Sequence, residues 1–292
     1  GESAFKNCIN LRTINSPNGV ESLEFGVFSG CESLEELVEF PMANNYFGYY
    51  FGAYSYKESS DAVPKSLKTV ELKAGSIIAD HAFDSCASLE HVVIAPTDVI
   101  GAYAFSGCKN LVSIDIPNDV KNIKDHAFDG CVRLESFIMP DSVTELGKGI
   151  LEGCMYIREI RLSSNLTLAG IADYTEDLET DNGQHVNGSP FLGIDKSRSL
   201  LERYIVADDH PQFMTDSYGI LYEKMVVDSK TVPVAVIDAP AMTNLSTYEL
   251  PDYIVEICPY AFAYTSIQSV DLAYVRLVGN HAFFSAAALS YV

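Results

Sequence analysis

A repeat of about 23 residues recurs along this 292-residue chain and constrains its fold more than any other feature. In the copy that begins at Phe105, Cys follows three residues later, Leu at six, Ile at nine and eleven, and Pro at twelve. Val and Ile follow at fifteen and eighteen, and the count restarts at Phe128. This spacing fits neither one long helix nor one strand. A fixed period of roughly 20–50 residues is typical of a solenoid, in which each repeat buries its apolar side against the next.

Other copies vary in regularity, and insertions separate some of them. Further copies begin at Phe5, Phe28, Phe83, Leu151, Phe191, Phe262 and Phe283. We therefore predict one solenoid domain over residues 1–292, with insertions at about 42–64, 169–190 and 207–247. The third insertion contains two alternating stretches, YGILYE and VPVAVI, which predict a small β-hairpin.

Each repeat divides into a strand and a turn. Ile-x-Ile-Pro predicts a short strand whose isoleucines point inward, and which ends at Pro because proline cannot donate to a ladder. Ala-Phe-x-x-Cys spaces its apolar residues at about one helical turn, which predicts a short α or 3₁₀ turn. Consecutive strands must run parallel because each returns by the same route. The fold class is therefore an α/β solenoid, with one parallel sheet of about ten short strands and the turns on its other side.

Composition excludes several classes of partner. The net charge of −21 argues against nucleic acid and against an anionic membrane surface, because both need clustered Lys and Arg. No apolar run approaches the roughly 18 residues of a membrane span, so we expect no direct membrane insertion by these residues.

The repeat resembles a known family, the BspA-like bacterial leucine-rich repeats. The resemblance is clearest over 104–146, where Leu111-x-x-Ile114-x-Ile116 corresponds to the LxxLxL core of leucine-rich repeats. It implies a right-handed superhelix. It also implies a secreted or surface-displayed bacterial protein, often an adhesin or binding scaffold, with any signal or anchor outside this sequence.

Six of the seven cysteines occupy one repeat position, three residues after the Phe or its Leu substitute. Nucleophiles and metal ligands do not recur in every repeat, whereas a small buried hydrophobe does. A stacked column also points its thiols the same way rather than at each other, so we predict free, buried thiols. Their spacing lacks the close CxxC pairs of a zinc site. We predict neither a metal nor a cofactor.

Histidine does not predict catalysis. His81, His126 and His281 each lie two residues before the Phe, where Tyr103 and Tyr260 lie in other repeats. We expect a rim position that accepts His or Tyr. The sequence has no GxSxG elbow, P-loop or HExxH motif, so we predict that the protein is not an enzyme.

An acidic segment at 173–181 offers carboxylates that could hold Ca²⁺. Counted from Asp177, however, Asn182 and Gly188 occupy the places where a calcium loop requires Gly and Glu. We expect a solvated loop.

The insertion at 42–64 is crowded with aromatic residues and has two interpretations. Tyrosines at a recognition surface offer contact area at low entropic cost, which makes the loop a candidate for partner binding. Alternatively, the loop folds back and caps the side of the solenoid. The candidate binding residues are Tyr46, Tyr49, Tyr50 and Tyr54.

The outward residues of the strands form a second candidate surface. The strip has no Tyr, Phe or Trp, which argues against stacking on sugars. Its mixed, mildly acidic character suits a protein partner or a basic peptide. The candidate residues are Glu71, Val93, Asp115, Ile138, Glu159 and Arg161.

The sequence thus favours a non-enzymatic extracellular module that binds a host or microbial surface protein through the strip or the tyrosine loop. The alternative is a spacer that displays other domains without a ligand of its own.

Overall fold

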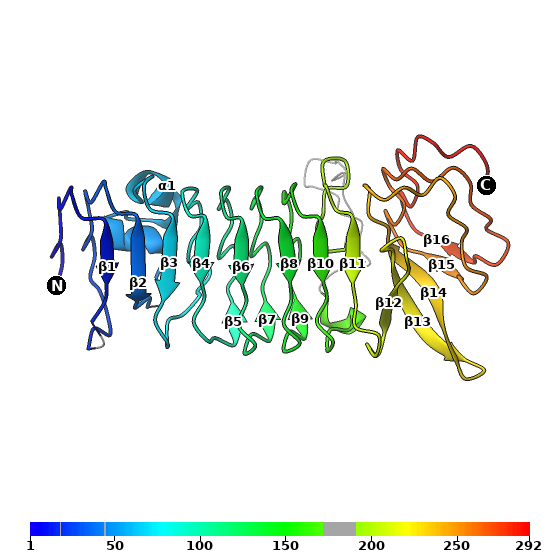
Figure 1. Cartoon of the computed structure of the whole chain (residues 1–292), viewed down its shortest axis with the longest axis horizontal. Helices are drawn as coiled ribbons and strands as arrows, with labels where there is room; N and C mark the ends of the chain where they lie inside the picture. Colours follow the sequence, from blue (N-terminus) through cyan, green and yellow to red (C-terminus); the bar gives the residue numbers. More distant parts are fainter. Residues whose placement is uncertain (18, 44, 172–190) are drawn as a thin grey trace. The chain divides into compact units, whose positions relative to one another are not determined.

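The computed structural model describes residues 1–17, 19–43, 45–171 and 191–292 (Figure 1). The chain divides into two compact units. Unit 1 comprises Gly1–Glu135 with Glu145–Cys154, and unit 2 comprises Ser136–Thr144 with Met155–Val292. The acidic segment considered for calcium lies outside the described residues, and the assignment of the chain to one domain stays a prediction.

Parallel strands form the main sheet of unit 1, as the repeat predicts (Figure 1). Its strands, in spatial order, are β1 (Thr13–Asn15), β2 (Glu36–Phe40), β3 (Thr69–Leu72), β4 (His91–Val93) and β6 (Ser113–Asp115). Leu37, Val70, Val92 and Ile114 lie opposite one another in register and are buried. The inward column predicted from the repeat is therefore confirmed.

A second, narrow parallel sheet in unit 1 was not predicted as strand. It contains β5 (Val99–Ile100), β7 (Asn122–Ile123) and β9 (Glu145–Leu146). These dipeptides come from the Val-x-x-Ile end of the repeat, and two residues are too few to show an alternating pattern. Ile100, Ile123 and Leu146 point into the core.

The described part of unit 2 contains two sheets. A parallel sheet of β8 (Ser136–Ile138), β10 (Glu159–Arg161) and β11 (Arg203–Ile205) continues the repeat pattern. A mixed sheet contains β12 (Phe213–Thr215), β13 (Leu221–Val227), β14 (Lys230–Asp238), β15 (Glu256–Ile257) and β16 (Leu277–Val278).

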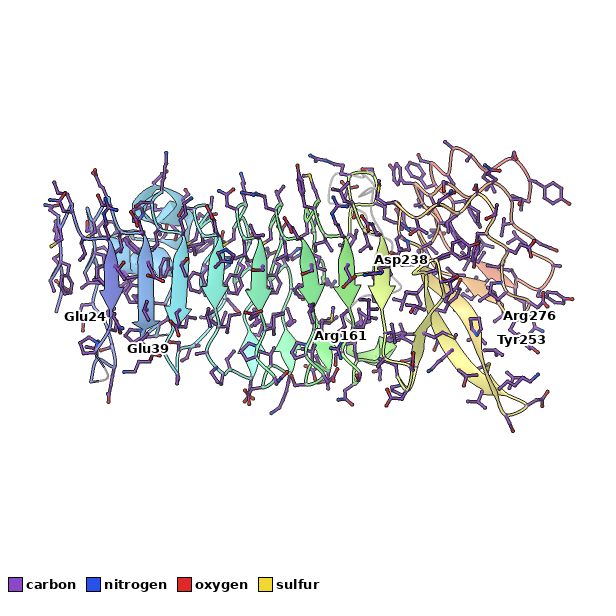
Figure 2. All side chains as sticks on the ribbon, viewed as in Figure 1. Glu24, Glu39, Arg161, Asp238, Tyr253 and Arg276 are labelled. Carbon is purple, nitrogen blue, oxygen red and sulfur yellow. The ribbon has the colours of Figure 1, made fainter. Side chains whose placement is uncertain are left out.

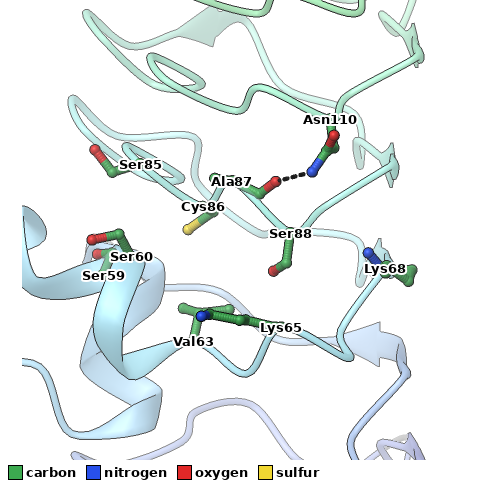
Figure 3. A pocket seen from close by; sticks show the side chains of 10 residues that line it. All are labelled: Ser59, Ser60, Val63, Lys65, Lys68, Ser85, Cys86, Ala87, Ser88 and Asn110. Carbon is green, nitrogen blue, oxygen red and sulfur yellow. Dashed lines mark hydrogen bonds between the residues drawn. The ribbon is translucent and has the colours of Figure 1, made fainter.

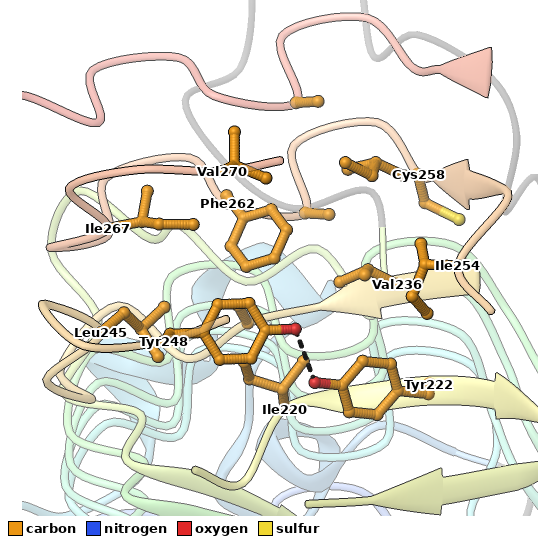
Figure 4. Close-up of a cluster of buried hydrophobic side chains, with 14 of the residues drawn as sticks. Ile220, Tyr222, Val236, Leu245, Tyr248, Ile254, Cys258, Phe262, Ile267 and Val270 are labelled. Carbon is orange, nitrogen blue, oxygen red and sulfur yellow. Dashed lines mark hydrogen bonds between the residues drawn. The ribbon is translucent and has the colours of Figure 1, made fainter. Parts of the chain in front are cut away.

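The predicted hairpin is confirmed as β13 and β14, which pair antiparallel through a turn at Asp228 and Ser229. Both turn residues have positive φ, as a type I′ turn requires. Unit 2 also contains a buried apolar cluster to which β13 and β14 contribute side chains. Within this cluster the Tyr222 and Tyr248 hydroxyls lie 2.8 Å apart (Figure 4).

The Ala-Phe-x-x-Cys stretches are turns that do not continue into helices. Cys108 N donates to Phe105 O at 3.1 Å, the i to i+3 bond of a 3₁₀ turn. Tyr103 and Gly107, two residues before and after the Phe, have φ of 55° and 68°. These left-handed residues interrupt any helix and aim backbone N–H groups at the next repeat, so that Phe105 N donates to Ala127 O at 2.7 Å.

Equivalent side chains consequently form columns. The rings of Phe83, Phe105 and Phe128 stack with centroids 5.2 and 5.3 Å apart. The cysteines form a parallel column: the Cys108 thiol donates to Phe83 O at 3.1 Å, and the Cys131 thiol donates to Phe105 O at 3.2 Å. All seven cysteines are free, and six are buried, whereas Cys8 is exposed. The predicted buried thiol column is therefore confirmed except at Cys8.

The thiol column predicts a pattern of reactivity. Burial raises the pKa of Cys86, Cys108, Cys131 and Cys154 above the usual thiol value, so these groups stay protonated even in mildly alkaline solution. The thiolate is the reactive form. In the native protein we expect iodoacetamide to modify Cys8 at least about 100-fold faster than Cys108, because exposure of Cys108 needs local opening. Peptide mass spectrometry after timed alkylation measures both rates, and comparable native-state rates would contradict the buried column.

Candidate functional site

The outward face of the main sheet in unit 1 forms a continuous polar strip. Parallel register aligns Glu36, Thr69, His91 and Ser113 in one column, and Glu71, Val93 and Asp115 in a second. His91, Val93, Ser113 and Asp115 are exposed, and Glu36, Thr69 and Glu71 are partly exposed. The structure therefore brings together three of the predicted residues, Glu71, Val93 and Asp115, on one accessible surface.

The carboxylates of this strip have no cationic partner among the described residues. Glu36, Glu71 and Asp115 take part in no ion pair that the described residues form. The cations beside the strip pair elsewhere: Arg12 lies 3.4 Å from Glu35, and Lys68 lies 3.0 Å from Glu90. The Lys68 amine donates a hydrogen bond to Glu90 and lowers the pKa of that carboxyl. The strip thus keeps three negative charges free for an outside cation.

The corresponding face of unit 2 has a different electrostatic character. Arg203 Nε donates to Glu159 Oε2 at 2.6 Å. Arg161, which is labelled in Figure 2, donates to Asp141 at 3.0 Å and to Met139 O at 2.8 Å. The predicted charges Glu159 and Arg161 are therefore already paired within unit 2.

Hydrogen bonds from Ser164 and then from Arg161 lower the pKa of Asp141. Ile138, which is 53% exposed, leaves an apolar patch beside the paired charges.

The aromatic insertion mainly fills the core. It forms the 3₁₀ helices η1 (Phe47–Phe51) and η2 (Tyr56–Glu58) and the short helix α1 (Ser59–Ala62). Phe47 N donates to Ala82 O at 2.6 Å, and the Phe47 ring lies 4.9 Å from that of Phe83. The insertion thereby supplies a ring to the phenylalanine column in place of a regular repeat.

Burial divides the four candidate tyrosines. Tyr50 is fully buried against Phe40, and its hydroxyl accepts a hydrogen bond from Ala43 N, so its ring offers no surface to a partner. The prediction that Tyr50 is one of the exposed binding residues is therefore wrong. Tyr46 and Tyr49 are half-buried, whereas Tyr54 is 82% exposed.

A stacked column of rings runs along the rim of unit 1. Tyr56 stacks on His81 at 3.9 Å, His81 on Tyr103 at 5.1 Å, and Tyr103 on His126 at 4.9 Å. The His81 ring lies 2.7 Å from an Asp84 oxygen, and the Glu152 carboxylate, 3.3 Å from His126 Nδ1, raises the pKa of His126. The column agrees with the predicted rim position. The column members that belong to repeats share one position, two residues before the repeat Phe, and this spacing identifies them in the sequence. Tyr56 belongs to the insertion, so this spacing does not identify it.

Unit 1 also contains a cavity of about 270 Å³ that the sequence did not predict (Figure 3). Its walls include Ser59, Lys65, Cys86 and Asn110, whose amide donates to Ala87 O at 2.8 Å. Cys86 is buried and its pKa is raised by desolvation, so it does not act there as a thiolate nucleophile.

Among the described residues, no group of three or more His, Cys, Asp or Glu side chains is placed to hold a metal ion. Within the same part of the chain, no helix has the length and apolarity needed to cross a membrane.

Comparisons with known proteins agree with the repeat. The BspA type leucine rich repeat region matches residues 1–74, 76–175 and 240–292 in six copies. A leucine rich cell surface protein from Faecalibacterium prausnitzii has a similar crystal structure, with 20% identity and a TM-score of 0.55 over 97% of this chain and 69% of that one. A leucine-rich repeat protein from Eubacterium ventriosum gives 18% identity and 0.57 over 82% and 63%. Comparison with curated proteins finds no match.

The mixed role of the insertion predicts two different mutational effects. Phe47→Ala removes a fully buried ring and should lower the free energy of unfolding by about 3–5 kcal/mol. Tyr54→Ala removes an exposed ring and should change it by less than about 0.5 kcal/mol. Urea denaturation followed by circular dichroism measures both variants. Equal, small effects would show that the insertion does not contribute to the core.

Proposed function

The chain belongs to the BspA-type leucine-rich repeat family, and we propose that it is a non-enzymatic extracellular binding module whose unit 1 strip engages a basic segment of a protein partner. Leucine-rich repeat folds present extended surfaces that generally bind proteins. The similar structure from F. prausnitzii is described as a cell surface protein, which supports an extracellular setting.

The observation that carries this proposal is a group of three carboxylates on an accessible sheet face that have no cationic partner among the described residues. Glu36 lies in the first column on β2, and Glu71 and Asp115 lie in the second column on β3 and β6, with Val93, 44% exposed, between them on β4. A partner's Lys or Arg side chain can approach these carboxylates without displacing an internal cation. The exposed valine adds an apolar contact on the same face. Charge complementarity of this kind steers encounter and fixes orientation.

The face of unit 2 is less suited to recruit a charged partner, because a partner cation would compete with Arg203 for Glu159. Its contribution to binding, through Ile138, Glu159 and Arg161, therefore stays secondary in this proposal. Tyr54 is the tyrosine of the insertion that is most available for an additional contact.

Charge reversal tests the strip directly. The triple variant Glu36→Lys, Glu71→Lys, Asp115→Lys should bind a biotinylated Arg/Lys-rich peptide at least about tenfold more weakly at physiological salt, since three charges on the same sheet face change sign. The matched control is Glu21→Lys, Asp61→Lys, Asp119→Lys, which alters the net charge equally at exposed positions outside the strip. Surface plasmon resonance measures both variants, and the same pair is then compared in capture of cell-surface proteins.

Three outcomes are decisive. Loss of binding by the strip variant alone supports the proposal. Equal loss in both variants would mean that only net charge matters, and no loss in either would favour a spacer that displays other domains.

A further inference from the structure

A lysine and an aspartate face each other in the dry interior of unit 2. Lys196 Nζ lies 3.0 Å from Asp238 Oδ1, and the two side chains are 1% and 0% exposed. Asp238 is the last residue of β14 (Figure 2). Lys196 Nζ also donates to the backbone carbonyls of Tyr260 at 3.2 Å and Ala261 at 2.8 Å.

A third polar group acts on the same carboxylate. The Tyr204 hydroxyl donates to Asp238 Oδ2 at 2.6 Å, on the oxygen that Lys196 does not contact. Tyr204 is buried, and its ring packs edge-on against Phe191 with centroids 5.8 Å apart. The amine and the carboxyl are thus held in contact, away from water, with the Tyr204 hydroxyl donating to the second oxygen.

Ionised, this pair is energetically costly. Removing an ammonium and a carboxylate from water costs several kcal/mol per ion, which their attraction repays only in part. Burial lowers the pKa of Lys196, although the charge of Asp238 opposes this shift. Proton transfer from Nζ to Oδ1 neutralises both groups and leaves a free amine beside a carboxylic acid.

We propose that Lys196 and Asp238 condense after folding into an intramolecular isopeptide bond. The Tyr260 and Ala261 carbonyls accept hydrogen bonds from the two N–H groups of the neutral amine and thereby orient its lone pair toward Asp238 Cγ. The lone pair forms the Nζ–Cγ bond, and the Cγ–Oδ1 bond breaks. Oδ1 leaves as water with two protons that originate from the ammonium. The nitrogen keeps one hydrogen, and no atom is oxidised or reduced.

Tyr204 is the polarising residue of this step. Its hydroxyl donates to Oδ2, where negative charge develops when the amine adds to Cγ. Donors placed in this way accelerate acyl chemistry by about 100–1,000-fold. Fixed proximity supplies the remaining advantage, because well-oriented intramolecular reactants reach effective concentrations of about 10⁵ M or more, far above the competing water.

The bond would join residues 42 positions apart and fasten the end of the hairpin insertion to the segment that enters β11. A neutral amide would also replace a buried ion pair. The cross-link therefore persists when unit 2 unfolds, unlike the hydrogen bonds around it.

Mass spectrometry of the intact protein tests this proposal without any variant. After prolonged incubation of the folded protein, its mass should be lower than the sequence mass by one water molecule. Proteolysis and fragmentation should then give a branched peptide that joins Lys196 to Asp238. An unchanged mass would overturn the proposal, as would loss of water located within a single unbranched peptide, which indicates a succinimide.

Variants separate the roles of the three residues. Lys196→Arg keeps the charge and should abolish the loss of water. Tyr204→Phe should slow it by about 100-fold while leaving the reactive pair in place. Circular dichroism establishes that each variant is folded before its mass is compared. A Tyr204→Phe rate equal to that of the original chain would remove Tyr204 from the mechanism.

Discussion

The hydrogen bonds between successive turn segments are the interaction on which the rest of this structure depends. Phe83 N donates to Ala104 O, and Phe105 N donates to Ala127 O, at 2.6 and 2.7 Å. A helix would use these N–H groups within its own repeat. Left-handed residues two positions before and after each Phe prevent that and turn every second N–H toward the neighbouring repeat. Each repeat is therefore held in register with the next on the turn side as well as on the strand side.

Register on both sides produces the columns and the candidate surface together. Because equivalent positions align, the Phe rings stack, the thiols meet the carbonyls of the preceding repeat, and outward residues form continuous rows. The charge that a row presents to solvent depends on which of its charged side chains form ion pairs with side chains on neighbouring strands. In unit 1, Glu71 and Asp115 face solvent without a cation among the described residues, whereas in unit 2 Arg203 neutralises Glu159.

The sequence predicts the regular features well because they depend on local pattern. Ile-x-Ile-Pro places inward residues such as Ile114, and the recurring Cys identifies the thiol column. Features that depend on contacts between residues far apart in the chain cannot be predicted from one sequence. Phe47 occupies the place of a repeat phenylalanine although the repeat motif is absent around it. Tyr50, in the same 3₁₀ helix, is therefore buried in the core. The pairing of Lys196 with Asp238 likewise arises from the three-dimensional packing of an insertion that interrupts the repeat.

Substitutions at the left-handed position two residues after the repeat Phe test the central role of these turns most directly. Ser85 and Gly107 occupy equivalent places with φ of 61° and 68°. Ser85→Gly relieves left-handed strain and should raise the free energy of unfolding by about 0.5–1 kcal/mol, whereas Gly107→Ala introduces that strain and should lower it by about 1–2 kcal/mol. Urea denaturation of both variants measures these opposite signs. Changes of the same sign in both variants would contradict the account.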